Sequence, residues 1–205
     1  MFGFGSAKGY SKKTIWCRNC RGQKIYGQVY VPDGGGEYPL VIFSHGYGYN
    51  ISFLESARLA DAGIAVCEFD FCGGSPWSKS DGKSVDMSVL TEADDLDAVL
   101  SEIKKQDYVD EKRIFLSGGS QGGVVSIIVG ERRQEDICGL ILYCPAIVIK
   151  DFEEEYLENI RFCCLVMSGD YIKNNFAIIK EYADVIENRL HDECTVENLL
   201  ADNAD

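Results

Sequence analysis

Histidine is scarce in this sequence, with only His45 and His191 among 205 residues. Cys17 and Cys20 form a lone CxxC pair, and a zinc site built on it would need a second pair of ligands that the chain does not offer. A redox CxxC usually opens a helix after a strand, whereas this pair lies between two strand-like segments. We therefore expect no metal and no organic cofactor. The nine cysteines are odd in number and scattered in spacing, which indicates free thiols in a reducing compartment.

Basic residues are also few: Lys and Arg number 20 against 33 Asp and Glu, for a formal net charge of −13. This excess of negative charge opposes binding to nucleic acid and to anionic membrane surfaces. No apolar run reaches transmembrane length, and residues 1–9 lack the apolar core of a signal peptide. We expect a cytoplasmic protein with one domain over residues 1–205, including a loose arm at 1–12 and a divergent C-terminal part at 147–205.

Strand-like and helix-like segments alternate along most of the chain. Continuous apolar runs, typical of buried parallel strands, occupy residues 39–44, 64–71, 114–116, 137–143 and 162–167. Residues 14–17 and 24–31 resemble antiparallel edge strands, and helical patterns occupy residues 52–62, 92–105 and 124–129. The predicted fold is α/β: a mainly parallel sheet with helices on both faces and antiparallel edge strands at the N-terminal end.

The helix expected over residues 92–105 carries one apolar stripe, which includes Leu96 and Leu100. Thr91 and Asp94 have the spacing of a capping box at its start. We interpret the many carboxylates of this helix as a solvated outer face.

A nucleophile elbow is the most informative motif. Gly118-x-Ser120-x-Gly122 matches G-x-S-x-G and lies between an apolar strand and an apolar helix, which is the context that the motif requires. Glycines two positions before and after the serine let the strand and the helix approach closely. The serine hydroxyl then stands beside the first N–H groups of the helix, which can stabilise an oxyanion. The motif predicts Ser120 as a nucleophile; the alternative is a plain glycine-rich loop.

Three motifs in this order resemble the α/β-hydrolase fold, and in particular the bacterial feruloyl (cinnamoyl) esterases and dipeptidyl-peptidase-like carboxylesterases. They are His-Gly-Tyr-Gly at 45–48, Phe-Asp-Phe-Cys-Gly-Gly-Ser at 69–75 and Gly-Gly-Ser-Gln-Gly-Gly at 118–123. The resemblance covers residues 25–146 and implies a single hydrolase domain with little or no lid. It implies hydrolysis of a small-molecule carboxylic ester through an acyl-enzyme on Ser120.

The resemblance also implies roles for the two loops. The backbone N–H groups of Tyr47 and Gln121 would form the oxyanion hole. Gly46 and Gly48 would leave the first loop free to approach, as Gly118 and Gly122 do at the elbow. His45 would hold that loop in place rather than act as the base. Asp70 would orient a loop or line the cleft; the alternative is that it serves as the acid.

The family order of nucleophile, acid and base implies Asp170 as the acid and His191, the only downstream histidine, as the base. A helical pattern from Phe176 to Leu190 nevertheless places His191 at a helix C-terminus rather than after a final strand.

A second interpretation is that the chain stops before the last two strands, and that Cys194–Val196 is too short to be one of them. The protein would then be a degenerate hydrolase without a complete triad, acting as a low-activity or binding module. The exposed sheet edge would favour a homo-oligomer. A peptidase or thioesterase on the same fold is a further alternative.

Overall fold

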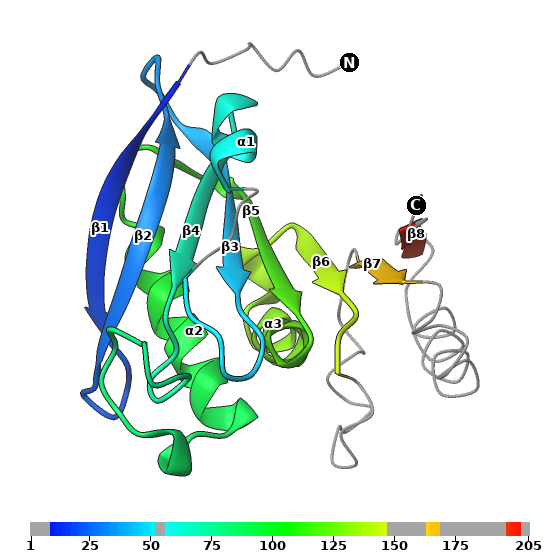
Figure 1. Cartoon of the computed structure of the whole chain (residues 1–205). Coiled ribbons are helices and arrows are strands. Elements are labelled where there is room, and N and C mark those ends of the chain that lie inside the picture. Colours follow the sequence, from blue (N-terminus) through cyan, green and yellow to red (C-terminus); the bar gives the residue numbers. More distant parts are fainter. Residues whose placement is uncertain (1–8, 52–55, 147–162, 169–195, 202–205) are drawn as a thin grey trace.

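The computed structural model describes residues 9–51, 56–146, 163–168 and 196–201, and Figure 1 shows how its elements are arranged. The strands are β1 (Tyr10–Arg18), β2 (Lys24–Pro32), β3 (Tyr38–Ser44), β4 (Ala65–Phe69), β5 (Val109–Gly119), β6 (Gly139–Tyr143), β7 (Cys163–Ser168) and β8 (Val196–Ala201). The helices are α1 (Ser56–Asp61), α2 (Val89–Ile103) and α3 (Gln121–Arg132), with short 3-10 turns at Ser84–Asp86 and Gln134–Asp136.

All of these strands form one sheet in the order β1-β2-β4-β3-β5-β6-β7-β8. β2 runs antiparallel to both of its neighbours, and every other pair is parallel. The predicted mainly parallel sheet with N-terminal antiparallel strands is therefore confirmed. The strand order reverses at β3, because β4 lies on one side of it and β5 on the other. Open α/β sheets bind their ligands at such a switch point, beyond the carboxyl ends of the strands.

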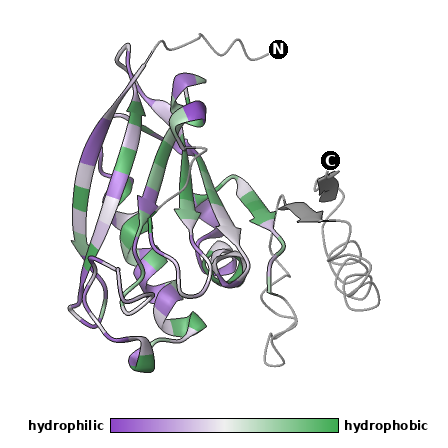
Figure 2. Cartoon of the chain, viewed as in Figure 1, coloured by the Kyte–Doolittle hydropathy of each residue, from purple (hydrophilic) through white to green (hydrophobic). Residues whose placement is uncertain are grey.

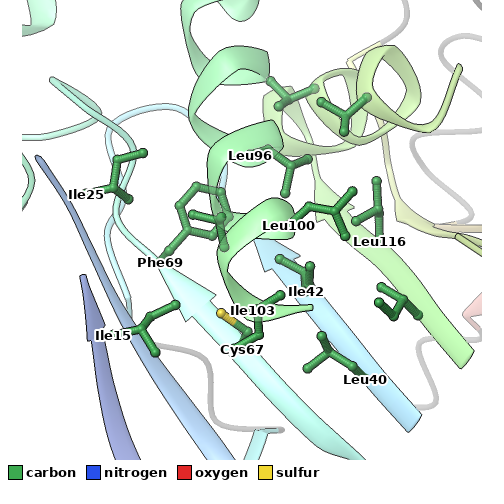
Figure 3. Packing of buried hydrophobic residues seen from close by; sticks show 14 of the residues in the cluster. Ile15, Ile25, Leu40, Ile42, Cys67, Phe69, Leu96, Leu100, Ile103 and Leu116 are labelled. Atoms are coloured by element: carbon green, nitrogen blue, oxygen red, sulfur yellow. The ribbon is translucent and has the colours of Figure 1, made fainter. Parts of the chain in front are cut away.

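Helices cover both faces of the sheet, as predicted. Alternate residues of β4 point to opposite faces: Cys67 packs in the large core cluster with Leu96 and Leu100 of α2, whereas Val66 packs with Ala60 of α1. α3 lies beside α2 on the first face. Figure 3 shows side chains of α2 lying over the central strands, and Figure 2 shows apolar residues gathered on these strands.

α2 begins earlier than its sequence pattern indicated. Its N-cap is Ser88, whose side chain accepts a hydrogen bond from the Thr91 N–H, while the Thr91 side chain accepts one from the Ser88 N–H. The box thus joins Ser88 to Thr91 rather than Thr91 to Asp94, and the prediction was wrong by three residues. Leu96, Leu100 and Ile103 are fully buried, and each such side chain contributes about 1.5–3 kcal/mol of hydrophobic stabilisation.

The chain ends differ from expectation at two places. β1 begins at Tyr10, so the last residues of the expected N-terminal arm belong to a strand. β7 confirms the apolar run at residues 162–167, but β8 was not expected. The residues Val-Glu-Asn-Leu-Leu-Ala of β8 neither alternate strictly nor form a continuous apolar run, so no strand signal stood out. The described sheet thus contains two strands beyond β6.

Candidate active site

Ser120 lies on a strained turn between β5 and α3. Its φ of 51° and ψ of −120° fall in a region that residues other than glycine rarely adopt, at a typical cost of about 1–3 kcal/mol. Hydrogen bonds hold this conformation: the Ser120 N–H donates to Tyr143 O at 3.0 Å, and the Ala146 N–H donates to Ser120 O at 2.9 Å. Ser120 itself is exposed. The loop after β6 therefore fixes the strained backbone and leaves the hydroxyl accessible.

The glycines of the motif allow a very close approach of strand, helix and loop. A Cβ added at Gly118 would lie 2.2 Å from Gly122 O, and one added at Gly122 would lie 2.2 Å from Ser44 O. No side chain fits at such distances without movement of the backbone. The elbow is thus held against both α3 and the end of β3.

The loop after β3 lies directly beside the elbow. Ser44 pairs with Gly118 across the parallel β3–β5 ladder, so the two loops leave adjacent strands at the same edge. A Cβ at Gly46 would stand 3.5 Å from Ser120 Cβ. Gly48 has a φ of 74°, which turns the loop back, and the Tyr49 N–H donates to Gly46 O at 3.3 Å. The segment that carries the Tyr47 N–H is therefore held in a tight turn next to Ser120.

The two N–H groups assigned to the oxyanion hole have no competing acceptor in the described part of the chain. Gln121 is the first residue of α3, and the first N–H groups of a helix have no partner inside it. Neither Gln121 nor Tyr47 donates to a loop or turn carbonyl among the residues that the structure describes. Among the described residues, no backbone acceptor therefore competes for either N–H group.

His45 uses both ring nitrogens to hold this edge of the sheet together. Nδ1 lies 2.9 Å from Gly46 O, and the Phe71 N–H donates to Nε2 at 3.2 Å. This pairing requires the neutral tautomer with its proton on Nδ1. Burial lowers the pKa of His45, which is only 7 % exposed. The ring thus links the loop after β3 to the loop after β4.

Asp70 organises the loops around the site through both carboxylate oxygens. Oδ1 accepts from the Ile51 N–H at 2.7 Å, and Oδ2 accepts from the Lys79 N–H at 2.8 Å. The residue is 1 % exposed. This arrangement matches the loop-orienting role rather than that of a triad acid, because both oxygens are already occupied by backbone donors.

Two carboxylates of α2 are buried near the site, contrary to the expected solvated face. Glu92 and Asp95 are 1 % and 0 % exposed. Gln121 Nε2 donates to Glu92 Oε2 at 2.5 Å, while Asp95 accepts from Arg21 and from the Cys72 N–H. A signal was present in the sequence, since Glu92 and Asp95 each lie four residues before a position of the apolar stripe.

A family profile described as "Serine aminopeptidase, S33" matches residues 38–186. The chain belongs to this family. Two curated relatives from Escherichia coli, both named "Uncharacterized 31.7 kDa protein in traX-finO intergenic region", are 28 % identical over 137 residues. The match covers 64 % of this chain and 47 % of each relative, so the chain spans about half the length of the curated relatives it matches.

Solved structures share the fold of this S33 family member. Est1E from Butyrivibrio proteoclasticus with bound ferulic acid has a TM-score of 0.72 at 19 % identity, over 92 % of this chain and 90 % of that one. Acetyl xylan esterase from Paenibacillus sp. R4 has a TM-score of 0.75 at 14 % identity, over 98 % and 80 %. Dienelactone hydrolase from Anabaena variabilis has a TM-score of 0.71 at 15 % identity, over 94 % and 87 %. The predicted α/β-hydrolase fold and the resemblance to its esterases are confirmed.

The acid and base predicted for this family member lie outside the described residues. Asp170 follows the last residue of β7, Ser168, by two positions in the sequence. His191 precedes the first residue of β8, Val196, by five positions. No histidine follows β8 in this sequence. Both assignments stay predictions.

Cys17 and Cys20 line a surface hollow of about 360 Å³, and Ser120 is not among its lining residues. Burial raises the pKa of the Cys17 thiol to about 11, and the Cys20 thiol lies 3.6 Å from Asp94 Oδ2 as its donor. The environment of Cys17 therefore disfavours the thiolate that metal binding and disulfide exchange require. Within the described ranges, no group of three or more His, Cys, Asp or Glu side chains could hold a metal ion.

Two observations concern parts of the molecule outside the site. A larger hollow of about 820 Å³ is lined by Lys104, Asp110 and Lys112, among others. It lies at the start of β5 and therefore at the opposite edge of the sheet from Ser120. No helix in the described part of the chain is long and apolar enough to cross a membrane.

Proposed function

We propose that this protein is a serine hydrolase that cleaves carboxylic esters through an acyl-enzyme on Ser120. The observation that carries the proposal is the exposed Ser120 at a φ of 51°, fixed on the elbow beside the glycine loop after β3. Strain of this kind persists where the surrounding structure over-determines it, and it clusters at functional sites. Membership of a hydrolase family and a fold shared with esterases support the same reaction.

The proposed reaction has two halves. Ser120 Oγ attacks the ester carbonyl carbon while a histidine base takes its proton, and the N–H groups of Tyr47 and Gln121 hold the resulting oxyanion. Collapse of the intermediate breaks the bond to the alcohol oxygen, which takes the proton and leaves. Water then attacks the acyl-enzyme by the same route, releasing the carboxylic acid and free Ser120. In the proposal, His191 is the base and Asp170 orients it.

We propose a small-molecule ester as substrate, with a small acyl or aromatic acid part. Exposed aromatic side chains at the same sheet edge support this choice: Tyr47 and Tyr49 follow β3, and Tyr143 ends β6 beside the elbow. The net charge of −13 argues against nucleic acid and anionic membranes as partners. We further propose a cytoplasmic location and a homo-oligomer in which copies pair through an exposed edge strand of the sheet.

One observation favours a second candidate, a hydrolase-like module of low activity. β8 is parallel to β7, so its last residue, Ala201, lies at the carboxyl ends of the parallel strands, as Ser120 does, whereas His191 precedes that strand in the sequence. If His191 does not act as the base, only the modest catalysis of the oxyanion hole and of substrate binding is left in this chain. A peptidase would differ from the esterase only in its substrate. Because the matching family is described as a serine aminopeptidase, the experiment below also tests for peptidase activity.

A fluorophosphonate probe tests the proposal, because it labels only an activated serine. We expect wild type to be labelled and Ser120→Ala to remain unlabelled, with both folded by circular dichroism. His191→Gln and Asp170→Asn should slow labelling by about 10³-fold or more if they complete the triad. A folded wild type that resists the probe and fails to hydrolyse p-nitrophenyl acetate would support the low-activity module instead. Faster turnover of an aminoacyl p-nitroanilide than of the ester would favour the peptidase.

A further inference from the structure

Glu92 is a buried carboxyl group that the proposed reaction does not itself use. It lies in the first turn of α2 and is 1 % exposed. Its Oε2 accepts a hydrogen bond of 2.5 Å from Nε2 of Gln121. Gln121 is the residue directly after Ser120 and the first of α3, and its backbone N–H is the proposed oxyanion donor. The Gln121 side chain thus connects the buried carboxyl group of Glu92 to the turn that carries Ser120.

The surroundings of Glu92 contain no compensating cation in the described part of the chain. Asp95, one turn further along α2, adds a second negative group, and Arg21 pairs with Asp95 rather than with Glu92. The Gln121 amide is the polar contact from α3. Burial therefore raises the pKa of Glu92 to about 7, offset in part by the hydrogen bond from Gln121. A buried carboxyl without a cation is costly, so its presence beside the nucleophile indicates a role there.

We propose that Glu92 is a positioning residue for the oxyanion hole, which holds the first residue of α3 through the Gln121 side chain. The inference rests on the proposed function, since it needs Ser120 as the nucleophile. The physical reason lies in the elbow itself. The Ser120 N–H donates to Tyr143 O, and the Ser120 C=O, which shares its peptide group with the Gln121 N–H, accepts from the N–H groups of Ala146 and Gly123. The Ser120 side of this peptide is thus held by the loop after β6, whereas its Gln121 side continues into α3. The Glu92 contact anchors that side to α2, the neighbouring helix.

The direction of the expected effect follows from the geometry of the reaction. An oxyanion donor must be in place before charge develops, and a displacement of about 1 Å can cost on the order of 100-fold in rate. Loss of the anchor should therefore lower kcat and leave KM nearly unchanged, since the donor acts on the transition state more than on the bound ester.

Four variants test the positioning role: Glu92→Ala, Glu92→Gln, Gln121→Ala and the double variant Glu92→Ala/Gln121→Ala. Labelling rates with the fluorophosphonate probe and kcat and KM for p-nitrophenyl acetate are measured for each. We expect Glu92→Ala to lower kcat and the labelling rate by about 10- to 100-fold, and Glu92→Gln, which keeps an acceptor oxygen, to restore most of the loss. The double variant should lose no more activity than either single variant, because each single variant already removes the contact between Glu92 and Gln121.

Glu102→Ala is the matched control, because Glu102 lies on the same helix but pairs with the exposed Lys105. It should react as wild type does. Full additivity of the Glu92 and Gln121 variants, or a Glu92→Ala rate equal to wild type, would overturn the positioning role while leaving Ser120 as the nucleophile. An unlabelled wild type would remove both proposals together.

If Glu92→Ala does not fold, the pH dependence of kcat in wild type and in Glu92→Gln tests the proposal instead. In wild type, kcat should rise with an ionisation near 7 as the anchor gains charge. Glu92→Gln should lose that step and keep any step due to the histidine base. An unchanged profile in Glu92→Gln would overturn the proposal.

Discussion

The Phe71 N–H donates to Nε2 of His45 at 3.2 Å, which leaves that ring nitrogen without a free lone pair. The other nitrogen faces Gly46 O at 2.9 Å and carries the proton. A general base needs a free nitrogen within reach of the nucleophile, and His45 has none in this arrangement. His45, the one histidine among the described residues, is therefore part of the scaffold that holds the loop after β3.

Replacement of His45 tests this distinction. His45→Gln keeps an acceptor for the Phe71 N–H, and we expect Ser120 labelling within about 10-fold of wild type, whereas loss of a true base costs 10³-fold or more. His45→Ala leaves a buried N–H unpaired and should lower the free energy of unfolding by about 1–3 kcal/mol. Probe labelling and urea denaturation measure the two effects. A His45→Gln protein that is stable but inert to the probe would contradict the scaffold role.

The pH dependence of stability offers a second measurement on the same residue. The folded state holds the pKa of His45 below the ordinary value of 6.5, so the unfolded chain binds the proton first as the pH falls. The stability that His45 contributes is thus present above pH 6.5 and lost below it. His45→Gln should lack this part of the acid destabilisation in urea titrations between pH 5 and pH 8.

The glycines of the elbow offer a comparison within one motif. A Cβ at Gly122 would lie 2.2 Å from Ser44 O, whereas one at Gly119 would meet nothing closer than 3.8 Å. We expect Gly122→Ala to lower the free energy of unfolding by about 3 kcal/mol, at the upper end of overpacking effects. Gly119→Ala, the control, should stay within about 1 kcal/mol of wild type in the same denaturation experiment. Equal stability of the two variants would contradict the close packing at Gly122.

The sequence predicted those parts of the fold and site that rest on short-range patterns. Apolar runs located the central strands, and G-x-S-x-G placed Ser120 on its elbow. The burial of Glu92 and Asp95 was missed because charge is a strong signal for solvent exposure, and only tertiary packing of α2 against α3 overrides it. β8 was missed because its pairing with β7 is long-range and its residues carry no periodic pattern. The spacing of Glu92 and Asp95 four residues before positions of the apolar stripe was a signal for their burial, whereas β8 carried no such signal.

Asp70 and Asp170 should separate stability from catalysis. Asp70→Asn replaces one of the two carboxylate oxygens by an amide N–H₂, so one of the two backbone N–H groups that donate to Asp70 loses its acceptor. We expect a loss of about 2 kcal/mol in the free energy of unfolding, with probe labelling retained in the folded fraction. Asp170→Asn, as the predicted triad acid, should do the reverse: about 10⁴-fold lower kcat with little change in stability. A catalytic loss of that size in folded Asp70→Asn would assign the acid to Asp70 instead.

The buried carboxyl of Glu92 should make the protein less stable as the pH rises. Its pKa is about 7 in the folded state against an ordinary value of 4.5, so between these values the unfolded chain has lost the proton that the folded state keeps. Stability therefore falls by about 1.4 kcal/mol per pH unit in this window, or about 3 kcal/mol in all. Glu92→Gln carries no ionisable group, so its advantage over wild type should grow by about that amount from pH 4 to pH 8 in urea denaturation. Glu102→Gln, at an exposed pair with Lys105, should stay within about 0.5 kcal/mol of wild type throughout. A flat difference between Glu92→Gln and wild type would mean that folding does not raise the pKa of Glu92 above its ordinary value of 4.5.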